Sequence, residues 1–329
     1  MINRTTCIGL LLATCGLLTQ PTWADETRQQ QQEFIELMVS KHQFDADQVT
    51  AILQQAQRNE DILTAIARPW EAKPWYQYYP IFLTEKRLQA GLKFWQQHQD
   101  VLTRAEQQFG VPAEIIVAII GVETFYGEYM GKYKVLDALY TLGFHYPPRA
   151  KFFRSELEQF LILTREESLP HDELYGSYAG AMGYGQFISS SYRHYAVDFD
   201  GDEVRDLLTN PVDAIGSVAN YFARHGWKAD QAVAIPLETE AQFAQWVSTG
   251  LKPSETVAEL QAKGLPLPAQ PTLASTIPAK VFAFEQVEGH EYWLGLHNFY
   301  VITRYNHSPL YAMAVYQFSQ QLKEAYQAE

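Results

Sequence analysis

Cysteine is almost absent from this chain of 329 residues. Its two cysteines, Cys7 and Cys15, both lie in an apolar N-terminal segment. If that segment is removed after Ala24, the mature chain has no thiol, which excludes disulfide bonds and cysteine catalysis. The fold must then rely on its hydrophobic core. Roughly 300 residues allow a large core, in one main domain with a smaller lobe.

Long apolar runs are missing as well. Ile8 to Leu18 is almost wholly apolar, but it is too short for a permanent membrane anchor. Arg4 places a positive charge before this run, and Thr22-Trp23-Ala24 offers a cleavage site after it. We therefore expect a cleaved signal peptide and a periplasmic protein. The alternative is a lipoprotein acylated on Cys15, although Thr14 fits the position before such a cysteine poorly.

Basic charge is scarce, with 25 basic against 38 acidic residues and a net charge of −13. Such a chain repels nucleic acid and anionic membrane surfaces, so neither is expected as a partner. The nine histidines are scattered, and no pair has zinc-ligand spacing with a third partner. We find no phosphate-binding glycine loop and no serine-nucleophile elbow.

The hydrophobic pattern is mostly helical before residue 227 and mixed after it. We expect Asp47 to cap the second helix, and one long helix from about Thr84 to Phe109 that ends at Gly110. The aromatic stretch with Pro69, Trp70 and residues 74–82 is expected to be a loop. A helix is expected over 213–225 and a last one over 310–326, with short strands at 233–236, 281–284, 292–294 and 299–302.

These elements predict an α+β class that is predominantly α-helical. The expected domains are a signal peptide (1–24), an N-terminal helical lobe (25–110), a catalytic core (111–226), a small β-containing lobe with a cleft segment (227–309) and a C-terminal helix on the helical lobe (310–329).

The most informative residue is Glu123. Pro112 opens a helix whose residues Ile116, Ile119 and Ile120 share a face with this carboxylate. Desolvation on such a face raises the proton affinity of a carboxyl group, as a general acid requires. The alternative is a glutamate at the end of a helix that reaches water.

Residues 176–187 hold four glycines within ten positions, which allow the backbone to approach a ligand closely. Ser177 and Gln186 supply hydrogen-bonding groups in this segment. A plain glycine-rich loop is the alternative interpretation.

An acidic segment follows, with the alternating oxygen donors that calcium prefers. The expected ligands at the first, third, fifth and seventh positions are Asp198, Asp200, Asp202 and the Val204 carbonyl. The sixth position is Glu203 rather than glycine, and the twelfth is Thr209 rather than glutamate. An acidic, solvated turn that caps the next helix is the alternative.

Several blocks together resemble the membrane-bound lytic murein transglycosylase B family, from about Phe34 to Tyr326. The blocks are Ile119–Thr124, Gly180–Phe187, Asp213–Phe222, Asn298–Tyr300 and Thr303–His307. The resemblance implies a lysozyme-like core that cleaves the MurNAc–GlcNAc bond of peptidoglycan. It places the single catalytic glutamate at Glu123, acting first as acid and then as base, with a 1,6-anhydro product and no catalytic cofactor.

The resemblance also implies a set of substrate residues. Ser177 and Gln186 would line the cleft, and the sugar contacts would be Tyr78, Tyr221, Tyr305, Asn306 and Tyr311. Arg149 matches a basic contact, but Pro148 stands where an adjacent arginine is often found. Any of these tyrosines could instead be a core residue. In the acidic segment, the resemblance implies a structural calcium ion in a lengthened loop, with Asp213 as the closing ligand.

Two other functions stay open. A lysozyme-type hydrolase would need a second carboxylate, for which Glu128 and Asp137 are the nearest candidates in sequence. A non-catalytic scaffold that binds peptidoglycan would not need Glu123 at all. The expected partners are peptidoglycan glycan strands and cell-wall synthesis proteins, and the expected state is a monomer.

Overall fold

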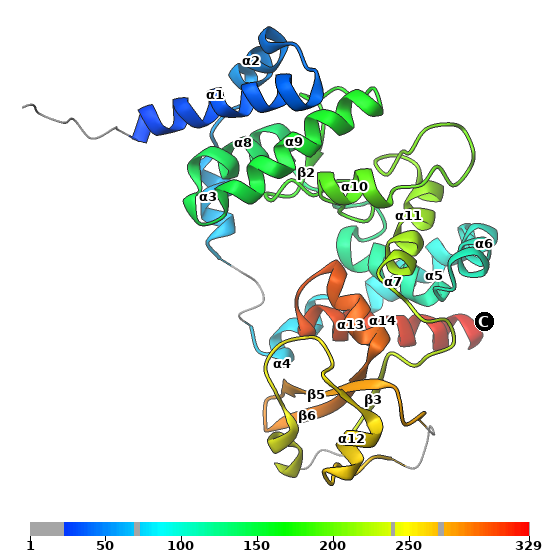
Figure 1. Ribbon diagram of the computed structural model, residues 1–329. Helices are drawn as coiled ribbons and strands as arrows, with labels where there is room; N and C mark the ends of the chain where they lie inside the picture. The colour runs from blue at the N-terminus through cyan, green and yellow to red at the C-terminus, as the bar shows by residue number, and fades with distance from the viewer. Residues whose placement is uncertain (1–22, 69–72, 238–240, 269–272, 329) are drawn as a thin grey trace, which may run out of the picture. The chain divides into compact units, whose positions relative to one another are not determined.

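The computed structural model describes residues 23–68, 73–237, 241–268 and 273–328 (Figure 1). They form two compact units, which divide between Thr50 and Ala51. Most of the expected signal peptide, with Cys7 and Cys15, lies outside the described residues, as do Pro69 and Trp70. The domain boundaries expected at residues 110, 226 and 309 remain predictions.

The first unit contains α1 (Trp23–His42) and the beginning of α2 (Ala46–Gln55). The cap of α2 is Asp45, whose Oδ1 accepts a bond of 2.9 Å from the Gln48 nitrogen. The expected cap, Asp47, is wrong, because Asp47 already lies in the first helical turn. Only the residue before the helix can reach the free nitrogen three positions on.

The second unit is mainly helical (Figure 1). Its helices are α3 (Glu60–Ile66), α4 (Trp75–Tyr78), α5 (Glu85–Gln97), α6 (Gln99–Phe109), α7 (Ala113–Thr124), α8 (Val135–His145), α9 (Ala150–Glu166), α10 (Ser189–Tyr195), α11 (Pro211–Arg224), α12 (Val257–Ala262), α13 (His297–Tyr305) and α14 (Pro309–Ala328). Short 3-10 turns are η2 (Tyr79–Ile81), η3 (Pro147–Arg149) and η4 (Ala241–Trp246).

Two expectations for the region before Gly110 are wrong. Residues 75–81 form α4 and η2 rather than an aromatic loop. The expected long helix is two helices, because His98 leaves the helical conformation (φ −118°, ψ 24°) between α5 and α6. The expected end at Gly110 is confirmed, since Gly110 adopts a left-handed conformation with φ 70°.

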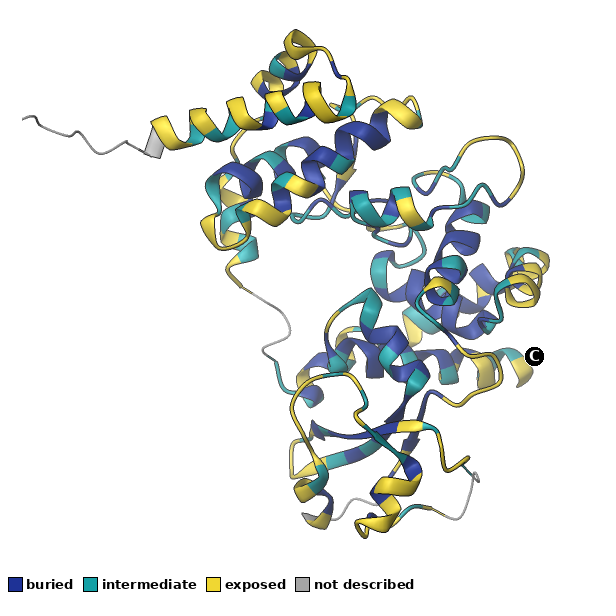
Figure 2. Cartoon of the chain, viewed as in Figure 1, coloured by how far each residue is buried: buried dark blue, intermediate teal, exposed yellow. Residues whose placement is uncertain are grey.

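Helix α7 is the central element of the second unit. Every residue from Ala113 to Val122 is buried, and the helix is dark blue along this length in Figure 2. It packs against α14, α5, α6 and α11. A helix that is apolar all round belongs inside a core, and each buried isoleucine contributes about 2 kcal/mol. The residue at the end of α7 is therefore anchored to the buried core of the unit.

A small antiparallel sheet has the strand order β3 (Ala234–Pro236), β6 (His290–Leu296), β5 (Pro278–Glu285), β4 (Glu255–Thr256). Val281 pairs with Leu294, and both belong to a buried cluster with residues of η4 and α12. A second pairing joins β1 (Tyr133–Lys134) to β2 (Tyr175–Gly176). The mostly helical α+β class is thereby confirmed.

Residues 299–302, expected to be a strand, lie in α13, so this expectation is wrong. Their short apolar run fits a buried helix as well as a strand, and periodicity cannot separate the two. The expected final helix is present as α14. Within the described ranges, no single helix has the length and apolarity to cross a membrane; the bent pair α6 and α7 passes this test together.

Candidate active site

Glu123 lies in the last turn of α7, where the chain reverses sharply. Phe125, Tyr126 and Gly127 follow with φ values of 52°, 62° and 91°. The side chain of Thr124 closes this turn, because its Oγ1 accepts a bond of 3.0 Å from the Gly127 nitrogen. Left-handed residues in succession are costly for non-glycine side chains, and such strain is found where the surrounding structure fixes the backbone.

The carboxyl group of Glu123 is partly buried and has one close polar neighbour from α14. The hydroxyl of Tyr311 donates a bond of 2.6 Å to Glu123 Oε1. Burial raises the pKa of Glu123 to about 7, while the bond from Tyr311 lowers it. The group is therefore balanced between acid and carboxylate near neutral pH, as the apolar face of the helix predicts.

Two further tyrosines lie near Glu123 or near its partner Tyr311. The hydroxyl of Tyr305 donates a bond of 2.6 Å to the Gly185 carbonyl, and its ring is 4.8 Å from that of Tyr221. Burial and the nearby Glu123 charge both raise the pKa of Tyr305. Tyr78, from α4, is buried and contributes to the raised pKa of Tyr311. The structure thus brings Tyr78, Tyr305 and Tyr311 into the surroundings of Glu123.

The side chains of both predicted polar residues form hydrogen bonds that hold the glycine-rich segment. Ser177 Oγ accepts bonds from the nitrogens of Ala179 (3.3 Å) and Ala181 (3.1 Å). Gln186 has φ 51°, and its amide donates bonds of 3.1 Å to the Met130 and Gly183 carbonyls. These side chains therefore shape the loop, and Gln186 also faces a pocket.

The segment connects α7 to the acidic loop. The Tyr184 nitrogen donates a bond of 3.0 Å to the Leu207 carbonyl, and the Tyr184 carbonyl accepts one of 2.8 Å from Thr124 Oγ1. Gly183 has φ 70°, and a Cβ at this position would lie 2.1 Å from the Leu207 carbonyl oxygen. This close approach explains why a glycine is required here.

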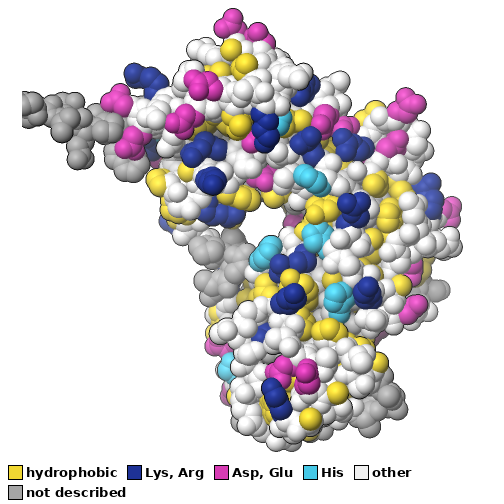
Figure 3. Space-filling model, in the orientation of Figure 1, with side chains coloured by type: hydrophobic (Ala, Val, Ile, Leu, Met, Phe, Trp, Pro, Cys, Tyr) yellow, Lys and Arg dark blue, Asp and Glu magenta, His cyan; other side chains and the backbone are white. Residues whose placement is uncertain are grey.

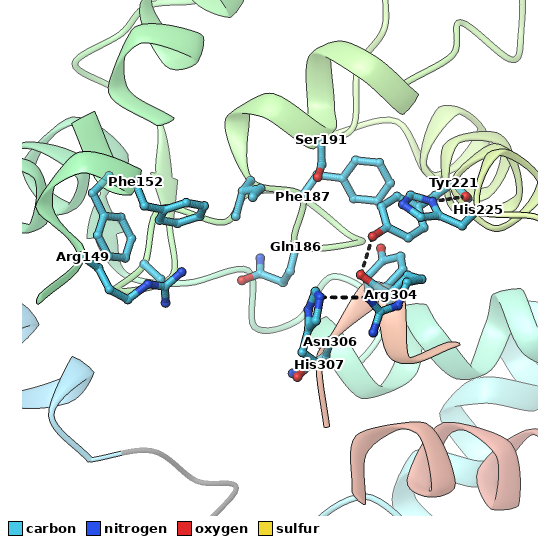
Figure 4. Close-up of a pocket in the computed structure, with 14 residues that line it drawn as sticks. Arg149, Phe152, Gln186, Phe187, Ser191, Tyr221, His225, Arg304, Asn306 and His307 are labelled. Atoms are coloured by element: carbon cyan, nitrogen blue, oxygen red, sulfur yellow. Dashed lines mark hydrogen bonds between the residues drawn. The ribbon is translucent and has the colours of Figure 1, made fainter. Parts of the chain in front are cut away.

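A pocket of about 700 Å³ lies beside these residues. Five of the predicted substrate residues line it: Arg149, Gln186, Tyr221, Tyr305 and Asn306. Glu123, Ser177, Tyr78 and Tyr311 are not among its described lining residues. Figure 4 shows Arg149 on one side of the pocket, Gln186 and Asn306 near the middle, and Tyr221 on the other side. Tyr305 connects the pocket to Glu123, because it lines the former and neighbours the latter.

Several lining residues were not expected from the sequence. They are Phe152, Phe153, Ala179, Phe187, Ile188, Ser191, His225, Arg304 and His307. Arg304 and His307 belong to the block 303–307, which also contains the predicted residues Tyr305 and Asn306. Their position beside these residues could have identified them from the sequence. His225 directly follows α11 and stacks on Tyr221, four residues earlier, with ring centroids 4.0 Å apart.

The candidates for a second carboxylate are placed differently from Glu123. Asp137 Oδ1 accepts a bond of 2.8 Å from the Gln57 nitrogen. Glu128 is exposed and is hydrogen-bonded to Tyr129. In the described part of the chain, no carboxylate contributes to the pKa of Glu123.

The acidic loop brings three of its predicted ligands together. Oxygens of Asp198, Asp200 and Asp202 lie within 4.8 Å of one another, a separation that fits ligand distances of about 2.3–2.6 Å around calcium. Asp213 is fully buried, and its two oxygens accept bonds from the Phe199 (2.7 Å) and Asp206 (2.8 Å) nitrogens. Asp213 therefore fastens the loop to α11 through backbone bonds and is not one of the three clustered carboxylates.

Comparison with known proteins gives consistent matches. A model of the transglycosylase SLT domain matches residues 26–320. The chain is 48% identical over 299 residues to membrane-bound lytic murein transglycosylase B of Escherichia coli (strain K12), covering 88% of this chain and 81% of the relative.

Solved structures are also similar. Lytic transglycosylase SltB1 of Pseudomonas aeruginosa, in a catenated form, matches with a TM-score of 0.86 and 47% identity, over 90% of this chain and 98% of that one. Escherichia coli lytic transglycosylase SLT35, solved with calcium, matches with a TM-score of 0.82 and 47% identity, over 90% of this chain and 93% of that one. SltB3 of P. aeruginosa, solved with NAG-NAM-pentapeptide, matches with a TM-score of 0.76 and 29% identity, over 91% of this chain and 80% of that one.

Replacing Gly183 with alanine tests the close approach of the glycine segment to the acidic loop. Gly289 provides a matched control, because its φ is 71° and a Cβ there would meet nothing within 4 Å. Both substitutions carry about 1–2 kcal/mol of left-handed strain. Gly183→Ala should cost about 1–3 kcal/mol more, because the Cβ overlaps Leu207. Equal losses in the free energy of unfolding, measured by urea denaturation, would contradict the packing described.

Proposed function

This chain belongs to the transglycosylase SLT domain family and is a lytic murein transglycosylase, and we propose that Glu123 is its single catalytic acid and base. The observation that carries the proposal is the partly buried Glu123 carboxyl at the end of α7, with a pKa of about 7. General acid–base catalysis is most efficient when the pKa lies near the working pH. A peptidoglycan-cleaving lyase needs such a group to give and to take a proton in one turnover.

In the first step, protonated Glu123 donates its proton to the glycosidic oxygen between MurNAc and GlcNAc. The bond from MurNAc C1 to this oxygen breaks, and the oxygen leaves as the C4 hydroxyl of GlcNAc. Glu123 becomes a carboxylate, which the hydroxyl of Tyr311 stabilises through its 2.6 Å bond to Oε1. Charge-assisted hydrogen bonds of this kind are stronger than neutral ones.

In the second step, the Glu123 carboxylate takes the proton of the C6 hydroxyl of the same MurNAc. The C6 oxygen attacks C1, which closes a 1,6-anhydro ring and returns Glu123 to its acid form. No water is consumed, so the product pair has the mass of the substrate. One carboxyl group serves both steps, whereas glycoside hydrolysis normally uses two.

The surroundings of Glu123 favour this mechanism over hydrolysis. A hydrolase would place a second carboxylate about 5–9.5 Å from the first. Asp137 is bonded to the Gln57 nitrogen, and Glu128 is exposed beside Tyr129. Neither carboxylate contributes to the pKa of Glu123. The scaffold alternative gives no reason for a glutamate with a raised pKa at this position.

For the substrate, we propose that glycan strands of peptidoglycan lie along the pocket and past Glu123. Tyr221 and Tyr305 present aromatic rings, and Gln186, Asn306 and Arg149 present polar groups to this pocket. Ser177, Tyr78 and Tyr311 would act nearer to the carboxyl group. Aromatic side chains with a polar tip suit neutral sugar rings.

We propose a structural calcium ion at Asp198, Asp200 and Asp202, with the Val204 carbonyl as a fourth ligand. The related SLT35 was solved with calcium. The ion would offset the repulsion of three carboxylates, and the catalytic steps above do not use it. Asp213 would secure the loop from behind, through the backbone bonds already described.

We propose a periplasmic location, with the signal peptide cleaved after Ala24. A relative in Escherichia coli is named membrane-bound, so acylation of Cys15 is the alternative, and palmitate labelling would support it. We also propose that the chain acts as a monomer and meets cell-wall synthesis proteins at the murein layer.

Replacing Glu123 with glutamine should lower the rate of murein cleavage by at least about 10²-fold, because the amide cannot exchange a proton with the sugar. Mass spectrometry of products from purified sacculi checks this, and the wild-type products should lack the added mass of water. Glu128→Gln is the matched control and should keep wild-type activity. Reducing ends with added water, or a Glu128-dependent rate, would favour the hydrolase.

Replacing Tyr311 with phenylalanine should move the alkaline limb of the pH–rate profile to higher pH. The Tyr311 hydroxyl stabilises the charged carboxylate and so lowers the pKa of Glu123. Without that bond the acid form persists to higher pH, and the first step, which needs the acid, is lost later as the pH rises. A limb that stays in place, or moves to lower pH, would contradict the assigned role of the bond.

Removing calcium with a chelator should lower the melting temperature by about 5 °C if calcium is near 100 times its Kd, since this saturation is worth about 2.7 kcal/mol. The chelator should change the free energy of binding of glycan fragments by less than it changes the free energy of unfolding. Asp200→Asn should abolish the chelator effect. Glu203→Gln should preserve it, because Glu203 is not in the cluster. An unchanged melting temperature in chelator would refute the site.

A further inference from the structure

Arg304 is a partly buried cation that the proposed chemistry does not use. Its Nη1 donates to His307 Nε2 (3.2 Å), its Nη2 donates to Thr303 Oγ1 (3.1 Å), and its guanidinium lies 4.4 Å from the Tyr300 ring centroid. The Nε atom is buried and has no hydrogen-bond partner. Within the described ranges, no carboxylate forms an ion pair with Arg304. The guanidinium is held in place but its charge is not balanced.

The histidine neighbours of Arg304 do not supply the missing negative charge. His307 must present a bare Nε2 to accept from Arg304, so its Nδ1 carries the hydrogen and remains a donor. Burial lowers the pKa of His307, and the charge of Arg304 lowers it further. The pKa of His225 is lowered by burial and by Arg304, against a smaller rise from its bond to the Tyr221 carbonyl. The positive charge of Arg304 therefore disfavours the protonated form of both histidines.

The pocket around Arg304 is basic at both ends. None of its lining residues is Asp or Glu, although the whole chain carries a net charge of −13. Arg149 lies on one side and Arg304 with His307 on the other, with Gln186 between them (Figure 4). In Figure 3, basic and histidine side chains gather in the middle of the drawn face, where few acidic ones lie. Such a pocket favours the binding of an anion over that of a cation.

The pocket is too large for a lone small ion. Its volume of about 700 Å³ is in the range of sites for molecules of drug size, and the apolar side chains of Phe187 and Ile188 also line it. The ligand that fits has an extended body and a negatively charged end. A peptide attached to a glycan has this chemistry, because its C-terminus is a carboxylate.

We propose that Arg304 and His307 form a carboxylate subsite that holds the peptide substituent of the glycan strand. The guanidinium binds the carboxylate through its free edge, and His307 Nδ1 donates a second bond. Arg–carboxylate pairs in partly buried sites are strong and directional. This subsite makes the enzyme discriminate peptide-bearing glycan from bare glycan. The inference rests on the proposed function of the same pocket.

The test measures binding with Glu123→Gln protein, which does not consume the ligand, by isothermal titration calorimetry. The first probe is GlcNAc-MurNAc-pentapeptide, the second is the same compound with its C-terminal carboxylate converted to an amide, and the third is the disaccharide without peptide. Adding Arg304→Gln should weaken binding of the first probe about 10-fold and leave the other two nearly unchanged. Adding His307→Gln, at an exposed position, should weaken the first probe by a smaller factor.

Arg58→Gln is the charge-matched control, because it removes one positive charge from an exposed pair with Glu60 outside the pocket. It should leave all three affinities unchanged. The subsite is refuted if Arg304→Gln and His307→Gln retain the parent preference for the carboxylate probe, or if they weaken all three probes equally. Failure of the proposed function is a separate result, since it appears as murein cleavage by the Glu123→Gln protein.

Discussion

The site depends on one partly buried carboxyl group at the end of an apolar helix. Helix α7 contributes no polar side chain between Ile115 and Val122, so Glu123 emerges directly from the core of the second unit. Burial alone drives the pKa of this group upward, and the hydrogen bond from Tyr311 limits the rise. Two opposed effects therefore hold the group near the point where it exchanges a proton at neutral pH.

Among the described residues, the segments around this group are connected by hydrogen bonds to backbone carbonyls. Thr124 binds Tyr184 in the glycine-rich segment, and Tyr184 in turn binds Leu207 beside the acidic loop. Tyr305 binds the Gly185 carbonyl from the other side. Glycines at tight positions, such as Gly183, allow these approaches. An ion in the acidic loop would therefore stabilise a segment that also touches the end of α7.

Much of this arrangement could be predicted from local patterns. The apolar spacing around Glu123, the alternating carboxylates from Asp198 to Asp202 and the stop at Gly110 are local signals, and they hold in the structure. The break at His98 and the helix over residues 299–302 were missed, because tertiary packing decides between alternatives that the pattern allows. The group formed by His225, Arg304 and His307 joins α11 to residues around the end of α13. No local pattern indicates that such distant residues meet.

The most direct test of the central claim is a titration of Glu123 itself, by ¹³C NMR of the protein with labelled glutamate, assigned with Glu123→Gln. We expect a carboxyl resonance that titrates with a pKa of about 7 in the free protein. A resonance that titrates near 4.5, the ordinary value for glutamate, would mean that the group is already ionised at neutral pH and could not act as the acid.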